Sequence, residues 1–370
     1  MAVSFLNRWY GRLVVVVIVL LPMWMWLFWR LTPKRKLVVA IIDKTVPASG
    51  GQEHVPLNWV LNQERFSKNK TELYQHEKDY YGFFPLSDRK FGLKGLERFS
   101  GDQLEQLSND ADVAYLRGGM SEKDLYFLKQ MRARHKLIIT EFDRLGSPTL
   151  DILRNDLEKS FGVRWTGWIG RYFDSFDTAV NRELPRWLVR NYRQQHNGQW
   201  PFKKSGIAFV RTDDKVVILE NETHLNKEFP YIFFNREAKV HYGLPDRIKY
   251  LHWFDMVDTD TSINHVLSIF EIDVNDKGKK ELAANGIPSA FPAISVHLNS
   301  DYRFFYFSGD FCDNPIRLIS SYFKGAGYFQ WLMYNGRDPL ERQSFFWKVY
   351  RPLVTTVLND YYGEKNHLGK

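Results

Sequence analysis

Three carboxylates and one arginine stand at the ends of four apolar runs that have the length of β-strands. The runs cover residues 37–43, 112–119, 136–141 and 303–310, and their endings supply Asp43, Arg117, Glu141 and Asp310. Buried parallel strands have such continuous apolar runs, and their carboxyl ends gather side chains around one crevice. We therefore expect a ligand-binding cleft at these ends, bordered also by Gly118 and Gly119.

Such a cluster supports two kinds of chemistry and one purely structural interpretation. Asp43, Glu141 and Asp310 could act as acid, base and electrostatic partner in the hydrolysis of a glycosidic or ester bond. The same groups beside Arg117 could bind a sugar or a cation without reacting. Alternatively, Arg117 forms structural ion pairs with its neighbours, because ion-pair networks are also common at strand ends.

A second candidate site is the aromatic segment 162–173. The aromatic side chains of Trp165, Trp168, Tyr172 and Phe173 could stack on sugar rings, since flat aromatic faces match the apolar faces of pyranoses. Arg171 would add a polar clamp. The alternative is a hydrophobic joint between the sheet and an inserted subdomain, because clustered aromatic residues commonly form cores.

The residue types required for metal and cofactor chemistry are not arranged for it. A single cysteine, Cys312, excludes a disulfide framework and a cysteine-based zinc site. No two histidines have helical ligand spacing, and the turn at 273–284 lacks the ligands of a calcium loop. Asp255, Asp258 and Asp260 are expected in loops. We predict no metal, no cofactor and, on balance, no enzymatic activity.

The composition is that of a folded protein with a moderate positive charge. The 370 residues include 51 Lys and Arg against 43 Asp and Glu, and 16% are aromatic, which is ample for a core. The basic residues are scattered apart from 34–36 and 277–280, so nucleic acid is not an expected partner.

An uncharged apolar run, 13–29, predicts a transmembrane anchor near the amino terminus. Its tryptophans lie at the carboxyl end, as in an interfacial aromatic belt, and no signal-peptide cleavage site follows. The predicted location is therefore the inner membrane, crossed once, with the bilayer as a partner. We expect the main domain outside the cytoplasm, although the basic residues after the run favour the opposite orientation.

The order of elements predicts an α/β fold. Strand 136–140 follows a capped helix at 121–135 and precedes a helix at about 147–161, an alternation typical of parallel sheets. Residues 206–210 and 215–220 predict a β-hairpin, and 266–272 and 291–297 predict further strands. We expect three parts: a tail and anchor (1–36), an α/β domain (37–325) with an insertion at 162–265, and a helical end (326–370).

The segment Leu116-Arg-Gly-Gly119, followed by the strand at 137–142, resembles the class I glutamine amidotransferase-like superfamily. In that family a Leu-Pro-Gly-Gly type turn precedes the elbow that carries a nucleophilic cysteine. Here the elbow reads Thr140-Glu141-Phe142, and the late strand ends in Phe307-Ser308-Gly309-Asp310, so the nucleophile and the catalytic histidine are missing. The resemblance implies a three-layer, flavodoxin-like, mostly parallel sheet without amidotransferase chemistry.

The chain is also similar to uncharacterised bacterial membrane-anchored proteins that carry segments like 43–47 and 162–173. Degenerate amidotransferase-like domains recur in proteins that handle polysaccharides. We therefore expect a membrane-tethered, non-catalytic binding or scaffold protein for envelope or exopolysaccharide assembly or export, with envelope proteins or polysaccharide as partners. The alternatives are a glycan hydrolase that uses the strand-end carboxylates and a cytoplasmic regulatory domain at the membrane.

Overall fold

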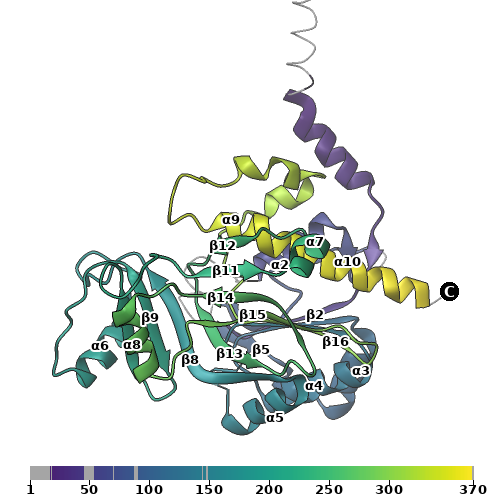
Figure 1. The fold of residues 1–370 in the computed structure, drawn as a ribbon. Coiled ribbons are helices and arrows are strands. Elements are labelled where there is room, and N and C mark those ends of the chain that lie inside the picture. The colour runs from purple at the N-terminus through teal and green to yellow at the C-terminus, as the bar shows by residue number, and fades with distance from the viewer. Residues whose placement is uncertain are drawn as a thin grey trace, which may run out of the picture.

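The computed structural model describes residues 17, 19–45, 54–69, 71–86, 91–143, 145–146 and 149–368. Within them, ten strands form one large sheet and four strands form a second sheet. Figure 1 shows the second sheet beside one end of the large sheet, and helices above and below the large sheet.

The centre of the large sheet consists of four strands that the apolar runs predict. They are β2 (Val39–Asp43), β6 (Val113–Arg117), β7 (Leu137–Glu141) and β16 (Arg303–Phe307). These strands pair in parallel in the order β16-β7-β6-β2. Asp43 is level with Arg117, and Phe307 is level with Glu141, so the carboxyl ends of the four strands lie along one edge.

Further strands flank this centre on both sides. On one side the sheet continues through β15 (Ala290–His297), β14 (His265–Glu271), β11 (Tyr231–Phe234) and β12 (Arg247–Lys249). On the other side lie β4 (Tyr81–Pro85) and β5 (Phe91–Lys94). β4 runs parallel to β2, and every other pair in these flanks is antiparallel.

The predicted fold class, a three-layer and mostly parallel sheet of flavodoxin-like or amidotransferase-like type with a transmembrane helix, is wrong. Five of the nine neighbouring pairs in the described large sheet are antiparallel, so the sheet is mixed. An apolar run predicts that a strand exists but not its direction, because direction depends on how the connecting segment returns to the sheet.

The second sheet is antiparallel throughout. Its order is β10 (Val216–Glu220), β9 (Gly206–Arg211), β8 (Val163–Phe173) and β13 (Phe254–Thr259). β9 and β10 are the predicted hairpin, which is confirmed, and α6 (Arg186–Gln195) lies against β10. The range 162–265 thus supplies this sheet but also gives β11 and β12 to the large sheet.

Three helices cover one face of the large sheet. They are α3 (Gly101–Asp110), α4 (Glu122–Ala133) and α5 (Asp151–Phe161). α4 begins with a capping box in which Ser121 and Asp124 bond each other's backbone, as the sequence predicts. α5 ends at Gly162, whose φ of 66° is left-handed, and a Cβ there would lie 2.9 Å from Nδ2 of Asn264.

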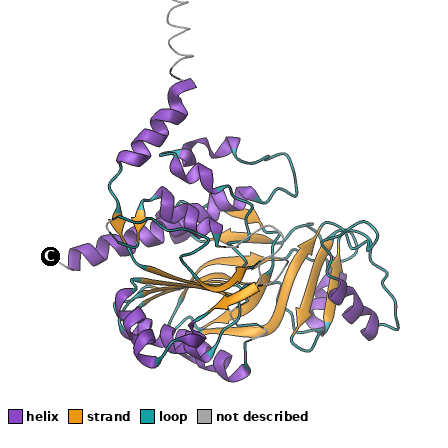
Figure 2. Ribbon diagram, turned by 180° about the vertical axis from the view of Figure 1, so that it is seen from behind, coloured by secondary structure: helices purple, strands orange, loops and turns teal. Residues whose placement is uncertain are grey.

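The other face carries the larger core and is rich in aromatic residues. α2 (Val55–Gln63), α7 (Arg236–Tyr242) and α10 (Arg351–Leu368) contribute to it, preceded by α9 (Gln343–Phe345) and a π-helix (Phe346–Tyr350). Figure 2 shows this helical layer above the sheet and α3 to α5 below it. The remaining elements are β1 (Arg35–Lys36), β3 (Phe66–Ser67), α8 (Asp276–Ala284) and 3-10 turns at Leu96–Arg98, Leu318–Tyr322 and Ala326–Leu332.

No helix in the described part of the chain has both the length and the apolar character needed to cross a membrane. The predicted anchor at 13–29, and with it the single-pass inner-membrane localisation, is therefore wrong. Residues 19–31 are helical, and the end of this helix is folded into the protein: Trp29 is buried, its indole donates to the Asn62 carbonyl at 2.9 Å, and the Arg65 guanidinium lies 4.3 Å over its ring. Residues 13–16 and 18 lie outside the described residues.

Candidate functional site

The four strand-end residues of the sequence prediction do gather around one point. Asp43 and Arg117 end neighbouring strands, and Glu141 ends the next. Asp310 lies three residues beyond β16, where its backbone N–H bonds the Trp253 carbonyl at 2.9 Å, and its carboxylate pairs with the Arg117 guanidinium. The positive charge of Arg117 contributes to the lowered pKa of Asp43 and opposes the rise in the pKa of Glu141 that burial causes.

This cluster is buried rather than open. The exposed fractions of Asp43, Arg117, Glu141 and Asp310 are 4%, 1%, 0% and 6%. Buried charges are stable only when paired and hydrogen-bonded, and these groups meet that requirement with one another and with neighbouring side chains. The cluster therefore has the composition of a catalytic site and the solvent exposure of a core.

Glu141 has both carboxylate oxygens occupied. One accepts the hydroxyl proton of Tyr115, and the other accepts the backbone N–H of Cys312 at 3.0 Å. Burial raises the pKa of Glu141 to about 7, although the Arg117 charge and these hydrogen bonds act in the opposite direction. At neutral pH the carboxyl group is thus present in both protonated and ionised forms.

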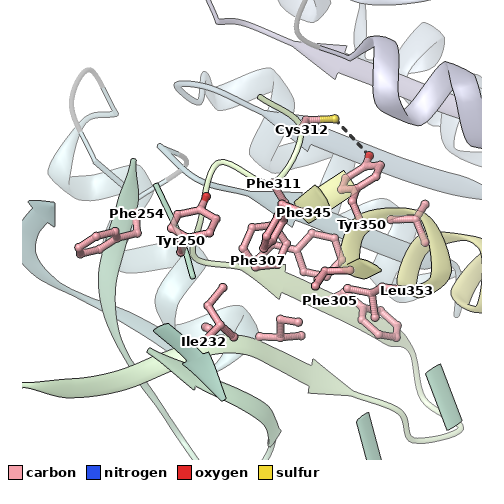
Figure 3. Close-up of a cluster of buried hydrophobic side chains, with 14 of the residues drawn as sticks. Ile232, Tyr250, Phe254, Phe305, Phe307, Phe311, Cys312, Phe345, Tyr350 and Leu353 are labelled. Carbon is pink, nitrogen blue, oxygen red and sulfur yellow. Dashed lines mark hydrogen bonds between the residues drawn. The ribbon is translucent and has the colours of Figure 1, made fainter. Parts of the chain in front are cut away.

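Local sequence patterns do not reveal the two partners of Glu141, Tyr115 and Cys312, or Tyr350, which contacts both of them. The hydroxyl of Tyr115 lies 3.0 Å from the Cys312 sulfur and 3.0 Å from the Tyr350 hydroxyl, and the sulfur lies 3.1 Å from Tyr350. Figure 3 shows Cys312 and Tyr350 at the edge of the aromatic core. Burial raises the pKa of the Cys312 thiol well above its ordinary value, which disfavours the thiolate a nucleophile requires.

Asp43 has its own partner in His54. The Asp43 carboxylate lies 2.8 Å from Nδ1 of His54, whose Nε2 lies 2.7 Å from the His76 carbonyl. Burial alone would raise the pKa of Asp43, but the hydrogen bond from His54 and the Arg117 charge outweigh it, so the pKa is lowered. Both ring nitrogens of His54 are occupied, and the ring is fully buried. The pair fixes the start of α2 to the end of β2.

Asp255 is a further buried carboxylate that the sequence analysis expected in a loop. That expectation is wrong, because Asp255 lies in β13 and is fully buried. Its side chain accepts the Tyr306 hydroxyl at 2.8 Å and the Asp143 backbone N–H at 3.1 Å. Burial raises its pKa to about 7. Asp255 thus connects β13 of the second sheet with β16 and with the segment after β7 in the large sheet.

Gly118 has a structural role. Its φ is 74°, and a Cβ would lie 2.7 Å from the backbone carbon of Lys44 and from the backbone nitrogen of Thr45. Only glycine fits this close approach between the segments that follow β6 and β2. Gly119, the next residue, is half-buried in the same turn. Gly118 thus allows the segments after β6 and β2 to approach each other closely.

The aromatic segment mainly forms core. Trp168 and Tyr172 are each 3% exposed and belong to the larger hydrophobic cluster, while Trp165 is half-buried and donates its indole N–H to the Trp168 carbonyl at 2.9 Å. The Tyr172 hydroxyl donates to Glu228 at 2.7 Å. These contacts correspond to the hydrophobic joint that was the alternative to a sugar-stacking platform.

Arg171 lies at the surface end of this segment. Its guanidinium bonds Glu183 at 2.5 Å, and the same carboxylate accepts Arg342 at 3.0 Å. These residues line a hollow of about 280 Å³ together with Tyr172, Phe173, Asp174, Leu251 and Leu340. The carboxylates of Glu183 and Asp174 together balance the two arginines, so the hollow has little net charge to offer a ligand.

The described residues contain no group of three or more His, Cys, Asp or Glu side chains that could hold a metal ion. The carboxylates of the strand-end cluster surround an arginine, which supplies the positive charge that a metal would bring.

Comparison with known proteins assigns no family. No protein-family model matches the chain, and no curated protein matches it by sequence. Among solved structures, a β-galactosidase from Bacillus circulans sp. alkalophilus aligns at 10% identity with a TM-score of 0.35, over 79% of this chain and 31% of that one. The cold-adapted β-galactosidase of Rahnella sp. R3 aligns at 9% identity with a TM-score of 0.38, over 88% and 31%. The chain thus spans less than a third of either enzyme, and TM-scores this low carry no argument.

Proposed function

We propose that this protein is a non-catalytic binding or scaffold subunit that serves the assembly or export of a bacterial envelope polysaccharide or exopolysaccharide. One observation carries the non-catalytic part: Glu141, the most enzyme-like residue of the strand-end cluster, is fully buried and has both oxygens bonded internally. A carboxylate that must attack, protonate or deprotonate a substrate has to reach it, and this one reaches only Tyr115 and Cys312.

The surrounding groups support the same proposal. Arg117 pairs with Asp310, and Asp43 pairs with His54. The first pair joins segments 193 positions apart in the chain, and the second fixes the start of α2 to the end of β2, as ion pairs that organise a fold do. The site most similar to a catalytic centre therefore acts, in this proposal, to join β2, β6, β7 and the segment after β16.

A glycan hydrolase is the second candidate, and one observation favours it. The pKa values of Glu141 and Asp255 are both raised to about 7, which is the range of a general acid at neutral pH. This alternative requires the residues above the strand ends to open and admit a substrate.

Substitution of Glu141 by glutamine distinguishes the two. Glutamine has the shape of the protonated carboxyl group and cannot exchange a proton. The purified wild-type protein and E141Q would each be incubated with neutral and acidic oligosaccharides, and new reducing ends would be counted. We expect no difference between them and equal retention of both proteins on the polysaccharide they bind. Reducing ends released by the wild type and absent with E141Q would establish the hydrolase instead.

A further inference from the structure

A concave surface beside α6 carries four arginines, and no acidic residue is among the described residues that line it. The hollow has a volume of about 1000 Å³ and is lined by Thr178, Asn181, Arg182, Leu184, Arg186, Val189, Arg190, Arg193, Gln194, Asn197 and Gly198. Arg182, Arg186, Arg190 and Arg193 are all exposed. A volume of this size is at the upper end of ordinary ligand pockets.

The helix geometry sets three of these arginines on one face. Arg186, Arg190 and Arg193 stand at positions i, i+4 and i+7 of α6, so they line one side of the helix over about 10 Å. The opposite face is fixed to the second sheet: Leu188 and Tyr192 belong to its hydrophobic cluster, and Asn191 donates to Asp214 at 3.0 Å. α6 lies beside the second sheet (Figure 1), so the sheet supports the helix that carries the arginine face.

The charges of this face are not neutralised by the protein. Among the described residues, no ion pair or side-chain hydrogen bond involves Arg182, Arg186, Arg190 or Arg193, whereas Arg171 on the neighbouring strand is paired with Glu183. The first turn of α6 also lacks an acidic residue, so the positive end of the helix dipole adds to the field. Four like charges in one concavity repel each other, and an anionic ligand would relieve that repulsion.

We propose that this α6 hollow binds a carboxylated oligosaccharide, that is, a segment of an acidic polysaccharide. The inference rests on the proposed function and specifies its ligand class and its site. Planar guanidinium groups take carboxylates in bidentate fashion, and successive arginines along α6 match a ligand with repeated carboxylates. The amides of Asn181, Gln194 and Asn197 and the hydroxyl of Thr178 provide partners for sugar hydroxyls between the charges.

The lining argues for a carbohydrate over a nucleic acid. Single-stranded nucleic acids are held by aromatic side chains on which the bases stack, and no aromatic residue is among the described residues that line the hollow. The floor is instead formed by the buried aliphatic side chains of Leu184 and Val189. These can contact the apolar faces of sugar rings without requiring a planar base.

Calorimetric titration of the full chain with a hexamer of galacturonic acid tests this inference. The hollow variant R186Q/R190Q removes two arginines that make no described internal bond, so it is expected to fold normally, as circular dichroism would show. The matched control R236Q/R317Q removes two exposed arginines elsewhere, on α7 and before the turn at 318–322. We expect the wild type and the control to bind equally, the hollow variant to bind at least about tenfold more weakly, and the affinity to fall with added salt.

Three results would overturn the inference. Equal binding by the hollow variant would place the ligand elsewhere on the protein and leave the proposed function standing. Equal affinity for a neutral maltohexaose would show that the arginines do not select the ligand. Binding of poly-glutamate or of a single-stranded oligonucleotide, with none of the uronate hexamer, would assign the hollow to a peptide or a nucleic acid. Cleavage of the hexamer, in contrast, would contradict the proposed function itself.

Discussion

The strand-end cluster (Asp43, Arg117, Glu141 and Asp310) and the α6 hollow use the same residue types in opposite ways. In the cluster, a single arginine and three carboxylates are buried: Arg117 pairs with Asp310, and the other two carboxylates are hydrogen-bonded by neighbouring residues. In the hollow, four arginines are exposed and lack acidic partners among the described lining residues. Residues able to do chemistry are thus not evidence of chemistry until their exposure and their partners are known.

The largest expected effect comes from removing the cation of the cluster. Arg117→Ala leaves Asp310, Asp43 and Glu141 buried without their common positive charge, and loss of one partner of a buried ion pair costs about 3–5 kcal/mol. Urea denaturation would measure this loss. Arg190→Gln is the control from the hollow, because an exposed arginine without a described partner changes the free energy of unfolding by no more than about 0.5 kcal/mol. Equal effects of the two substitutions would contradict the distinction between a buried structural cluster and an exposed hollow.

Trp168 tests whether the aromatic segment belongs to the core or to a ligand platform. Trp168→Ala removes a side chain that is 3% exposed, so we expect a loss of about 3–5 kcal/mol in the free energy of unfolding. Trp187→Ala, at a residue that is 39% exposed, serves as the control and should cost much less. A stable Trp168→Ala protein that has lost oligosaccharide binding would instead support a sugar-stacking platform.

The pH dependence of stability is the next largest effect. The pKa of Glu141 is about 7 in the folded protein and near 4.3 in the unfolded chain, so between these values only the folded state keeps the proton. Stability must therefore fall as pH rises from about 4 to about 7, by on the order of 3 kcal/mol. Urea midpoints measured across this range should show the fall in the wild type.

E141Q and Asp255→Asn separate the contributions to this fall. Each substitution should reduce the slope, because Asp255 also has a pKa of about 7 in the folded protein. Asp43 acts in a different window: its pKa is lowered, so its contribution is present above its ordinary pKa and is lost as pH falls further. An unchanged slope in E141Q would mean that Glu141 is ionised in the folded protein.

Much of the centre of the fold could be predicted from the sequence. The apolar runs that end in Asp43, Arg117 and Glu141 are buried strands, as their continuous apolar character predicts, and these strands are parallel neighbours in the structure. The antiparallel pairing of the flanking strands could not be predicted in this way. β14 and β15 were recognised as strands, but nothing in their composition shows that they run against each other.

The position of the site could be predicted from the sequence, but the burial of its side chains could not. The chain beyond β16 folds back and brings Cys312 onto Glu141, a contact of residues 171 positions apart that no local pattern reveals. The arginine face of α6, in contrast, has a readable signal. The spacing of Arg186, Arg190 and Arg193 repeats with the period of a helix, and the sequence analysis passed over it because the basic residues were treated as scattered.

The separation of a structural cluster from a binding hollow is the central claim, and ligand-induced thermal stabilisation tests it most directly. The melting temperature would be measured with and without the uronate hexamer for the wild type, for Arg117→Ala and for R186Q/R190Q. A ligand that binds the folded state raises the melting temperature. We predict that the hexamer stabilises the wild type and the less stable Arg117→Ala protein but not R186Q/R190Q. Stabilisation of R186Q/R190Q, with none in Arg117→Ala, would contradict the account.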